Sequence, residues 1–157
     1  MKVKNIMTKD PTCCVPSDSA QRAASIMRSE HAGIVPVIEN EQSRTIVGVV
    51  TDRDLCMTVI ADGGDPKSVS VEDCMTTKIV SCSPNDSVDK ATELMRDNQI
   101  RRVLVCDDQR GLVGIVALAD VVKRPDAKMT QTHETLKQVS APTDEASKPR
   151  AQSKQAA

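Results

Sequence analysis

The chain has 157 residues, a formal net charge of −1 and no phenylalanine, tyrosine or tryptophan, so it has room for one ordinary domain or two very small ones that share a core. Its 21 basic and 22 acidic residues nearly balance, and it has no aromatic rings on which bases could stack, so nucleic acid is not expected as a partner. The first ten residues lack the apolar segment of a signal peptide, and no apolar run is long enough to span a bilayer, so we expect a cytoplasmic protein with no membrane partner.

The two halves of the sequence repeat each other. The segment that begins at Val3 aligns without a gap to the segment that begins at Val71, as far as residue 40, and twelve of the aligned pairs are identical. After a two-residue difference in the following loop, the alignment resumes with Gly48 opposite Gly114. Identities in register over this length predict two copies of one structural unit.

In the first copy, residues 16–19 are a helix-start signal, because oxygen-bearing side chains there can accept from the free N–H groups of the first turn. The helix that follows has small and apolar residues on one face. Short β-branched runs at 34–38 and 46–50 predict two buried strands. A second helix is expected from Asp52 to about Asp62.

The second copy carries the same signals in the same order. Residues 84–87 start a helix, strands are expected at 103–106 and 112–116, and the last helix begins at Leu118 and ends before Pro125. The order β-α-β-β-α, twice, predicts an α/β (α+β) fold. Since one copy of about 55 residues would bury little core alone, we expect the two to pack through their sheets about a pseudo-twofold axis.

This organisation divides the chain into four segments. We expect a first repeat at residues 1–62, a linker at 63–70 and a second repeat at 71–124. Residues 125–157 are polar, with few aliphatic side chains, and are expected to be a largely disordered tail.

Residues 48–54, Gly-Val-Val-Thr-Asp-Arg-Asp, lie where a strand ends and a helix begins. Thr51 is placed to cap the helix, among N–H groups that suit a phosphate, and Asp54 can accept from two neighbouring hydroxyls of a ribose. Simpler roles stay open, with Thr51 as a plain N-cap and Asp54 as a solvated acid that the helix dipole favours. No nucleophile is paired with a base, so no catalytic residues and no enzyme are predicted.

The heptad, the duplicated β-α-β-β-α units and the repeated V-x-x-x-M-T openings resemble the cystathionine-β-synthase (CBS) domain family, in which two repeats form a Bateman module. The resemblance extends over residues 3–124 and is greatest to stand-alone bacterial CBS-pair proteins. It implies a regulatory module that binds AMP, ADP, ATP or S-adenosylmethionine between the repeats. It also implies a homodimer that signals through a conformational or dimer change to a downstream protein that the sequence does not identify. The alternative is a structural or interaction protein whose clefts are vestigial and which acts through dimerisation.

The resemblance assigns residues to two ligand-binding clefts. The first would be built from Thr51, Asp54, Lys78, Ile79, Val80, Arg101 and Arg102. Arg102 would pair with a phosphate, although Arg101 and Arg102 also suit plain surface charges. The second, weaker cleft would be built from Thr12, Cys13, Ile34, Val35 and Asp120. There Ala117 replaces the threonine and Ile34 replaces the arginine, so we expect this cleft to be empty or to hold adenosine without a strong phosphate contact.

Six cysteines occur without any C-x-x-C pair, at positions 13, 14, 56, 74, 82 and 106. We expect reduced, mostly buried side chains and predict no metal site. A zinc site assembled from cysteine and histidine by folding stays open as an alternative.

Overall fold

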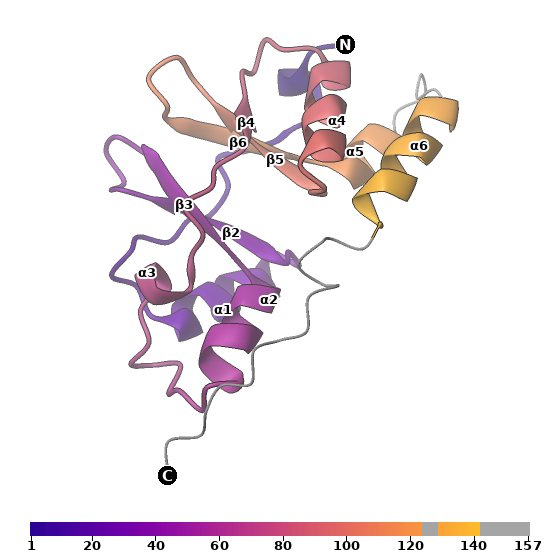
Figure 1. Cartoon of the computed structure of the whole chain (residues 1–157). Helices are drawn as coiled ribbons and strands as arrows, with labels where there is room; N and C mark the ends of the chain where they lie inside the picture. Colours follow the sequence, from indigo (N-terminus) through magenta and orange to yellow (C-terminus); the bar gives the residue numbers. More distant parts are fainter. Residues whose placement is uncertain (124–128, 142–157) are drawn as a thin grey trace.

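The computed structural model of the chain describes residues 1–123 and 129–141 (Figure 1). The first half contains η1 (Val3–Asn5), β1 (Thr8–Lys9), α1 (Ala20–Ser29), β2 (Ile34–Ile38), β3 (Ile46–Thr51), α2 (Asp52–Leu55) and the π-helical turn η2 (Cys56–Ile60). The second half contains α3 (Val71–Cys74), β4 (Ser81–Cys82), α4 (Val88–Asp97), β5 (Arg102–Cys106), β6 (Leu112–Ala117), α5 (Leu118–Val122) and α6 (Met129–Val139). The predicted α+β fold with two repeats is confirmed.

The main helices begin where the sequence predicts. The side chain of Ser19 accepts a hydrogen bond from the backbone of Arg22 at the start of α1, at 3.2 Å. Ser87 accepts in the same way from Lys90 at the start of α4, at 3.1 Å. Each serine satisfies a first-turn N–H group that has no partner within its helix.

Each repeat is centred on an antiparallel hairpin, β2–β3 in the first and β5–β6 in the second. In the second repeat β1 and β4 flank the hairpin, in the order β1-β6-β5-β4. In the first repeat the same two flanking places are held by isolated bridges, from Thr76 to Val49 and from Cys14 to Val37. The two repeats therefore share one topology and differ in how regular their edges are.

The opening segment of each sequence repeat packs on the other structural repeat. The backbone N–H of Val3 donates to Asp86, at 2.9 Å, and that of Val71 donates to Asp18, at 2.7 Å. Val3 belongs to the apolar core of the second repeat and Val71 to that of the first. The structural units consequently cross the boundaries 1–62 and 71–124 that the sequence repeat suggests.

This exchange explains the glycine that opens the heptad. A Cβ atom on Gly48 would lie 2.8 Å from Sδ of Met75 and 3.0 Å from the carbonyl oxygen of Thr76. Gly114 stands in the same relation to Met7 and to the residue after it. The glycine is thus required by the close approach of the exchanged opening segment, and not by a ligand.

The hairpins of the two repeats meet at the centre of the molecule. The N–H of Leu112 donates to the carbonyl of Arg44, at 2.9 Å, and the N–H of Ile46 donates to the carbonyl of Arg110, at 3.3 Å. This reciprocal pair marks the expected pseudo-twofold axis. A third apolar cluster fills the interface, made of Cys13, Ile38, Ile46, Leu104, Cys106 and Leu112.

Five of the six cysteines are buried free thiols, and Cys56 is exposed. Burial raises the pKa of Cys13 to about 11 and that of Cys14 to about 12, because the thiolate loses its hydration. The expectation that the cysteines are mostly buried side chains is confirmed.

The tail at 125–157 was expected to be largely disordered, and the structure corrects this for residues 129–139, which form α6. Figure 1 shows α6 beside α4 and α5, and its Val139 is 8% exposed and joins the core of the second repeat. In the first repeat the second helix continues through η2 and supplies Val59 to the core. In the second repeat α5 ends at Val122, which leaves room for α6 against the apolar core. Residues 125–128 and 142–157 of the predicted tail lie outside the described residues.

Over the described part of the chain, no helix combines the length and apolar character that a membrane span requires.

Candidate functional site

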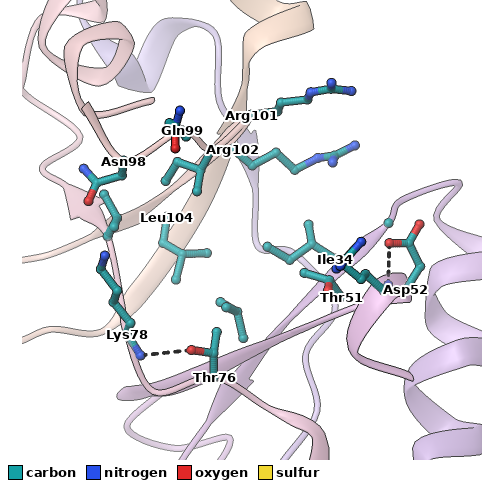
Figure 2. Close-up of a pocket in the computed structure, with 15 residues that line it drawn as sticks. Ile34, Thr51, Asp52, Thr76, Lys78, Asn98, Gln99, Arg101, Arg102 and Leu104 are labelled. Atoms are coloured by element: carbon teal, nitrogen blue, oxygen red, sulfur yellow. Dashed lines mark hydrogen bonds between the residues drawn. The ribbon is translucent and has the colours of Figure 1, made fainter. Parts of the chain in front are cut away.

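A cavity of about 610 Å³ lies between the repeats (Figure 2). The first repeat contributes the end of β3, the start of α2 and the residues that precede β2. The second contributes the extended segment before β4 and the turn between α4 and β5. This volume and this position between two repeats suit a small organic ligand.

Five of the seven residues predicted for the first cleft line this cavity: Thr51, Lys78, Val80, Arg101 and Arg102. The other two predicted residues, Asp54 and Ile79, are not in its wall. Ile79 is half-buried and packs against the central apolar cluster.

Thr51 and Asp54 form a capping box at the start of α2. The carboxylate oxygen Oδ2 of Asp54 accepts from the Thr51 N–H at 2.8 Å and from the Thr51 hydroxyl at 2.7 Å, and the Asp54 N–H donates to the same hydroxyl at 3.2 Å. The other oxygen, Oδ1, accepts no hydrogen bond from residues 1–123 or 129–141. Thr51 therefore is an N-cap, as its simpler interpretation proposed, and it also lines the cavity.

Four cationic side chains line the cavity, from Arg53, Lys78, Arg101 and Arg102. None of the four forms a salt bridge with any residue that the structure describes. Figure 2 shows Arg101 and Arg102 extended in the same direction, toward the side of the cavity where Ile34 and Thr51 lie. Unpaired guanidinium groups beside a cavity are suited to bind an anionic ligand.

Sequence reasoning missed the turn between α4 and β5. Asn98 and Gln99 line the cavity, and Gln99 has the left-handed φ of 53° that ends a helix. The amide of Asn98 donates to the carbonyl of Leu94, at 3.0 Å, which fixes the side chain at the end of α4. The available signal was the end of the apolar periodicity in α4, which marks where this helix ends. A helix end that precedes a central strand lies at the same edge of the sheet as the heptad at residues 48–54.

The five residues predicted for the second cleft lie in different surroundings. Ile34 lines the first cavity, where the hairpin register pairs it with Thr51. Cys13 and Val35 are buried in apolar clusters, Cys13 at the interface and Val35 in the first repeat. The remaining two, Thr12 and Asp120, stay at the second cleft and are described next.

The second cleft keeps only part of the capping geometry. The carboxylate of Asp120 accepts from the N–H of Ala117, at 2.9 Å, but Ala117 has no hydroxyl to complete the box. Nearby, the hydroxyl of Thr12 donates to the carboxylate of Glu30, at 3.0 Å. This side of the molecule therefore presents a carboxylate where the first cavity presents the Asn98 amide.

The chain matches the CBS domain family over residues 3–60 and 71–127. It is 40% identical to the CBS domain-containing protein YhcV of Bacillus subtilis (strain 168) over 119 residues, which are 76% of this chain and 81% of that protein. It is 30% identical to the hypoxic response protein 1 of Mycobacterium tuberculosis over 120 residues, 76% of this chain and 82% of that protein.

Solved structures of similar proteins contain bound ligands. CBSX2 in complex with AMP superposes with a TM-score of 0.66 at 27% identity, covering 78% of this chain and 93% of that one. The CBS domain pair of MJ0100, in complex with 5′-methylthioadenosine and S-adenosyl-L-methionine, gives a TM-score of 0.69 at 27% identity, with 78% and 94% covered. Hypoxic Response Protein I with two coordinated zinc ions gives 0.70 at 29% identity, with 79% and 98% covered. In this chain, no group of three or more histidine, cysteine or acidic side chains suited to a metal occurs among the residues described.

Proposed function

The chain belongs to the CBS domain family, and we propose that it is a regulatory module that binds an adenosyl ligand in the cavity between its two repeats. The observation that carries the proposal is the cavity itself, which combines the capped strand end of the first repeat with the cationic turn of the second. The complexes of CBSX2 with AMP and of MJ0100 with S-adenosyl-L-methionine support the ligand class. AMP, ADP, ATP and S-adenosylmethionine are the candidates.

In this proposal, different residues contact different parts of the ligand. The free oxygen Oδ1 of Asp54, held beside the cavity by the capping box, accepts from a ribose hydroxyl. Val80 and Leu104 give an apolar wall for the base. Arg102, with Arg101 beside it, pairs with phosphate. Ile79, which packs in the interface, has an indirect role in placing this wall.

A ligand held by both repeats favours one relative position of the two, and a partner protein reads that position. We further propose a non-enzymatic, cytoplasmic homodimer. Ile60, which is 74% exposed, and Val122, which is also exposed, lie on the second helix of each repeat and offer apolar surface for a second copy. Size-exclusion chromatography with light scattering measures the dimer, and Ile60→Asp weakens it if this surface is used.

The proposal is tested by calorimetric titration of the four candidates into wild type, Asp54→Ala and Asp120→Ala. Each substitution removes a carboxylate that accepts from the backbone N–H of the N-cap residue of a short helix, Thr51 or Ala117, and Asp54→Ala also loses the contact with the Thr51 hydroxyl. We expect Asp54→Ala to lose binding and Asp120→Ala to keep it. Equal binding heats in wild type and Asp54→Ala refute the assignment of the site.

The alternative is a structural or interaction protein with vestigial clefts that acts through dimerisation. The incomplete capping box at Ala117 favours it for the second cleft. A thermal-shift panel distinguishes the two functions, because a ligand that binds only the folded state raises Tm. If no candidate ligand raises Tm, the alternative function is favoured.

A further inference from the structure

We propose that the cavity selects a nucleotide with at least two phosphates, binds one per chain, and rejects the cationic ligand S-adenosylmethionine. This inference rests on the proposed function and names the ligand class of the same site. It comes from the charges of the cavity and from the loss of two of its four cations, Arg53 and Lys78, at the pseudo-equivalent cleft.

The charges at the first cavity exceed what one phosphate needs. Arg53, Lys78, Arg101 and Arg102 come from three different segments, and the single carboxylate among the described lining residues is that of Asp52. An oxygen of Asp52 already accepts from the backbone N–H of Arg53, at 2.8 Å. Four cations without salt bridges favour a ligand with several negative charges. The same charges disfavour a sulfonium group.

The pseudo-twofold axis supplies an internal comparison. The N–H of Asp52 donates to the carbonyl of Gly33, at 3.1 Å, and the N–H of Leu118 donates to the carbonyl of Arg101, at 2.9 Å. These two contacts are equivalent, so they fix which residues correspond at the two clefts. Arg53 and Lys78 correspond to Ala119 and Asp10, so neither cation recurs at the second cleft. Arg101 and Arg102 correspond to Gly33 and Ile34, which also line the first cavity, so the two arginines lie between the clefts, next to Leu118 and Ala117 of the second.

Acidic side chains at the second cleft replace one neutral and one cationic side chain of the first cavity. Asn98, which lines the first cavity, corresponds to Glu30. The hydrogen bond from Thr12 to Glu30 places that carboxylate against the segment that forms the cleft wall. Together with Asp10, which is exposed, it balances the charges of Arg101 and Arg102, which leaves the second cleft without the net positive charge that favours phosphate in the first. A phosphorylated ligand is therefore limited to one site per chain.

Calorimetry with ADP, ATP, AMP, adenosine and S-adenosylmethionine, in a metal-free buffer at fixed salt, tests this selection. A hydrogen bond from a cation to a phosphate contributes about ten-fold or more in affinity. We expect ADP and ATP to bind at least about ten-fold more tightly than AMP or S-adenosylmethionine, with one site per chain. The affinity for ADP also falls as salt rises, because exposed charges are screened.

Three variants separate the effect of charge on ligand affinity from effects on folding. Arg102→Ile and Asn98→Glu each install the residue that the second repeat carries at the corresponding place, so the fold accommodates them. Each is expected to lower the affinity for ADP by about ten-fold and to leave the affinity for adenosine unchanged. Arg28→Gln removes an exposed charge on α1, away from the cavity, and is the matched control with unchanged binding.

The outcomes distinguish this inference from the proposed function. Adenosine or S-adenosylmethionine binding as tightly as ADP, or two ADP sites per chain, overturns the selection and leaves the proposed function standing. If Arg102→Ile loses affinity for ADP and adenosine equally, the selection is also overturned, since the residue would then act on the shape of the site. If none of the five compounds binds, the proposed function and the selection both fail.

Discussion

The capping boxes at the two clefts differ by one hydroxyl, and exchanging it should change stability in opposite directions. Thr51 has φ −113° and ψ 162°, and Ala117 has φ −102° and ψ 153°, so the two backbones are nearly superimposable. The Thr51 hydroxyl takes part in two hydrogen bonds with Asp54 that Ala117 cannot make with Asp120. Thr51→Ala removes both, and loss of an N-cap side chain costs about 1 kcal/mol of unfolding free energy.

In a chain of this size, that loss lowers Tm by about 3 °C. Ala117→Thr adds the missing hydroxyl on a backbone that already suits it, and should raise stability by up to about 1 kcal/mol. The double variant Thr51→Ala/Ala117→Thr should lie close to wild type, because distant sites add. Urea denaturation followed by circular dichroism measures all three. If Thr51→Ala is as stable as wild type, or Ala117→Thr is destabilised, the capping account is wrong.

Four further predictions concern core packing and the cysteines. Gly48→Ala should cost about 1–3 kcal/mol by urea denaturation, because the new methyl group meets the exchanged opening segment, and a neutral effect would contradict that close approach. A thiol reagent at pH 8 should label only Cys56 rapidly in the native protein, and Cys56→Ser should abolish this phase; rapid labelling of Cys14 would show that it is not buried. Since burial raises the pKa of Cys14 from 9.0 to about 12, its contribution to stability is complete below pH 9 and declines as the pH rises above that value. Val139→Ala should cost about 2 kcal/mol and the matched change of the exposed Leu136 to alanine much less, so equal effects would argue against the packing of α6.

Local patterns predicted most of the elements, and long-range contacts account for what they missed. Ser19 and Ser87 are found at the helix starts because a cap depends only on the next three residues. The exchange that buries Val71 in the first repeat depends on contacts between distant segments, which periodicity does not contain. Val139 was overlooked because a few widely spaced apolar residues in a polar segment give a weak signal, yet a short α5 leaves it a place in the core.

The candidate site was predictable where it depends on single positions that match the family pattern. Thr51 and Arg102 line the cavity as the resemblance to the family implied. Ile34, which was predicted for the second cleft, lines the first cavity, where the hairpin pairs it with Thr51. A residue near a pseudo-twofold axis is close to both clefts, so its assignment needs coordinates.

Comparing the repeats separates what holds the fold from what serves the site. Gly48 and Gly114 are alike because the same close backbone approach occurs twice, and any side chain there would disturb packing in either repeat. Arg102 and Ile34 differ at the equivalent strand position without changing the hairpin register, so the fold does not require the arginine. An unpaired charge that the fold does not require is costly unless it meets a counter-charge, and under the proposed function a bound anion supplies that counter-charge to the half-buried Arg102. The proposed ligand would account for the charge at Arg102, and we predict that replacing this residue with isoleucine preserves stability while removing the preference for phosphate.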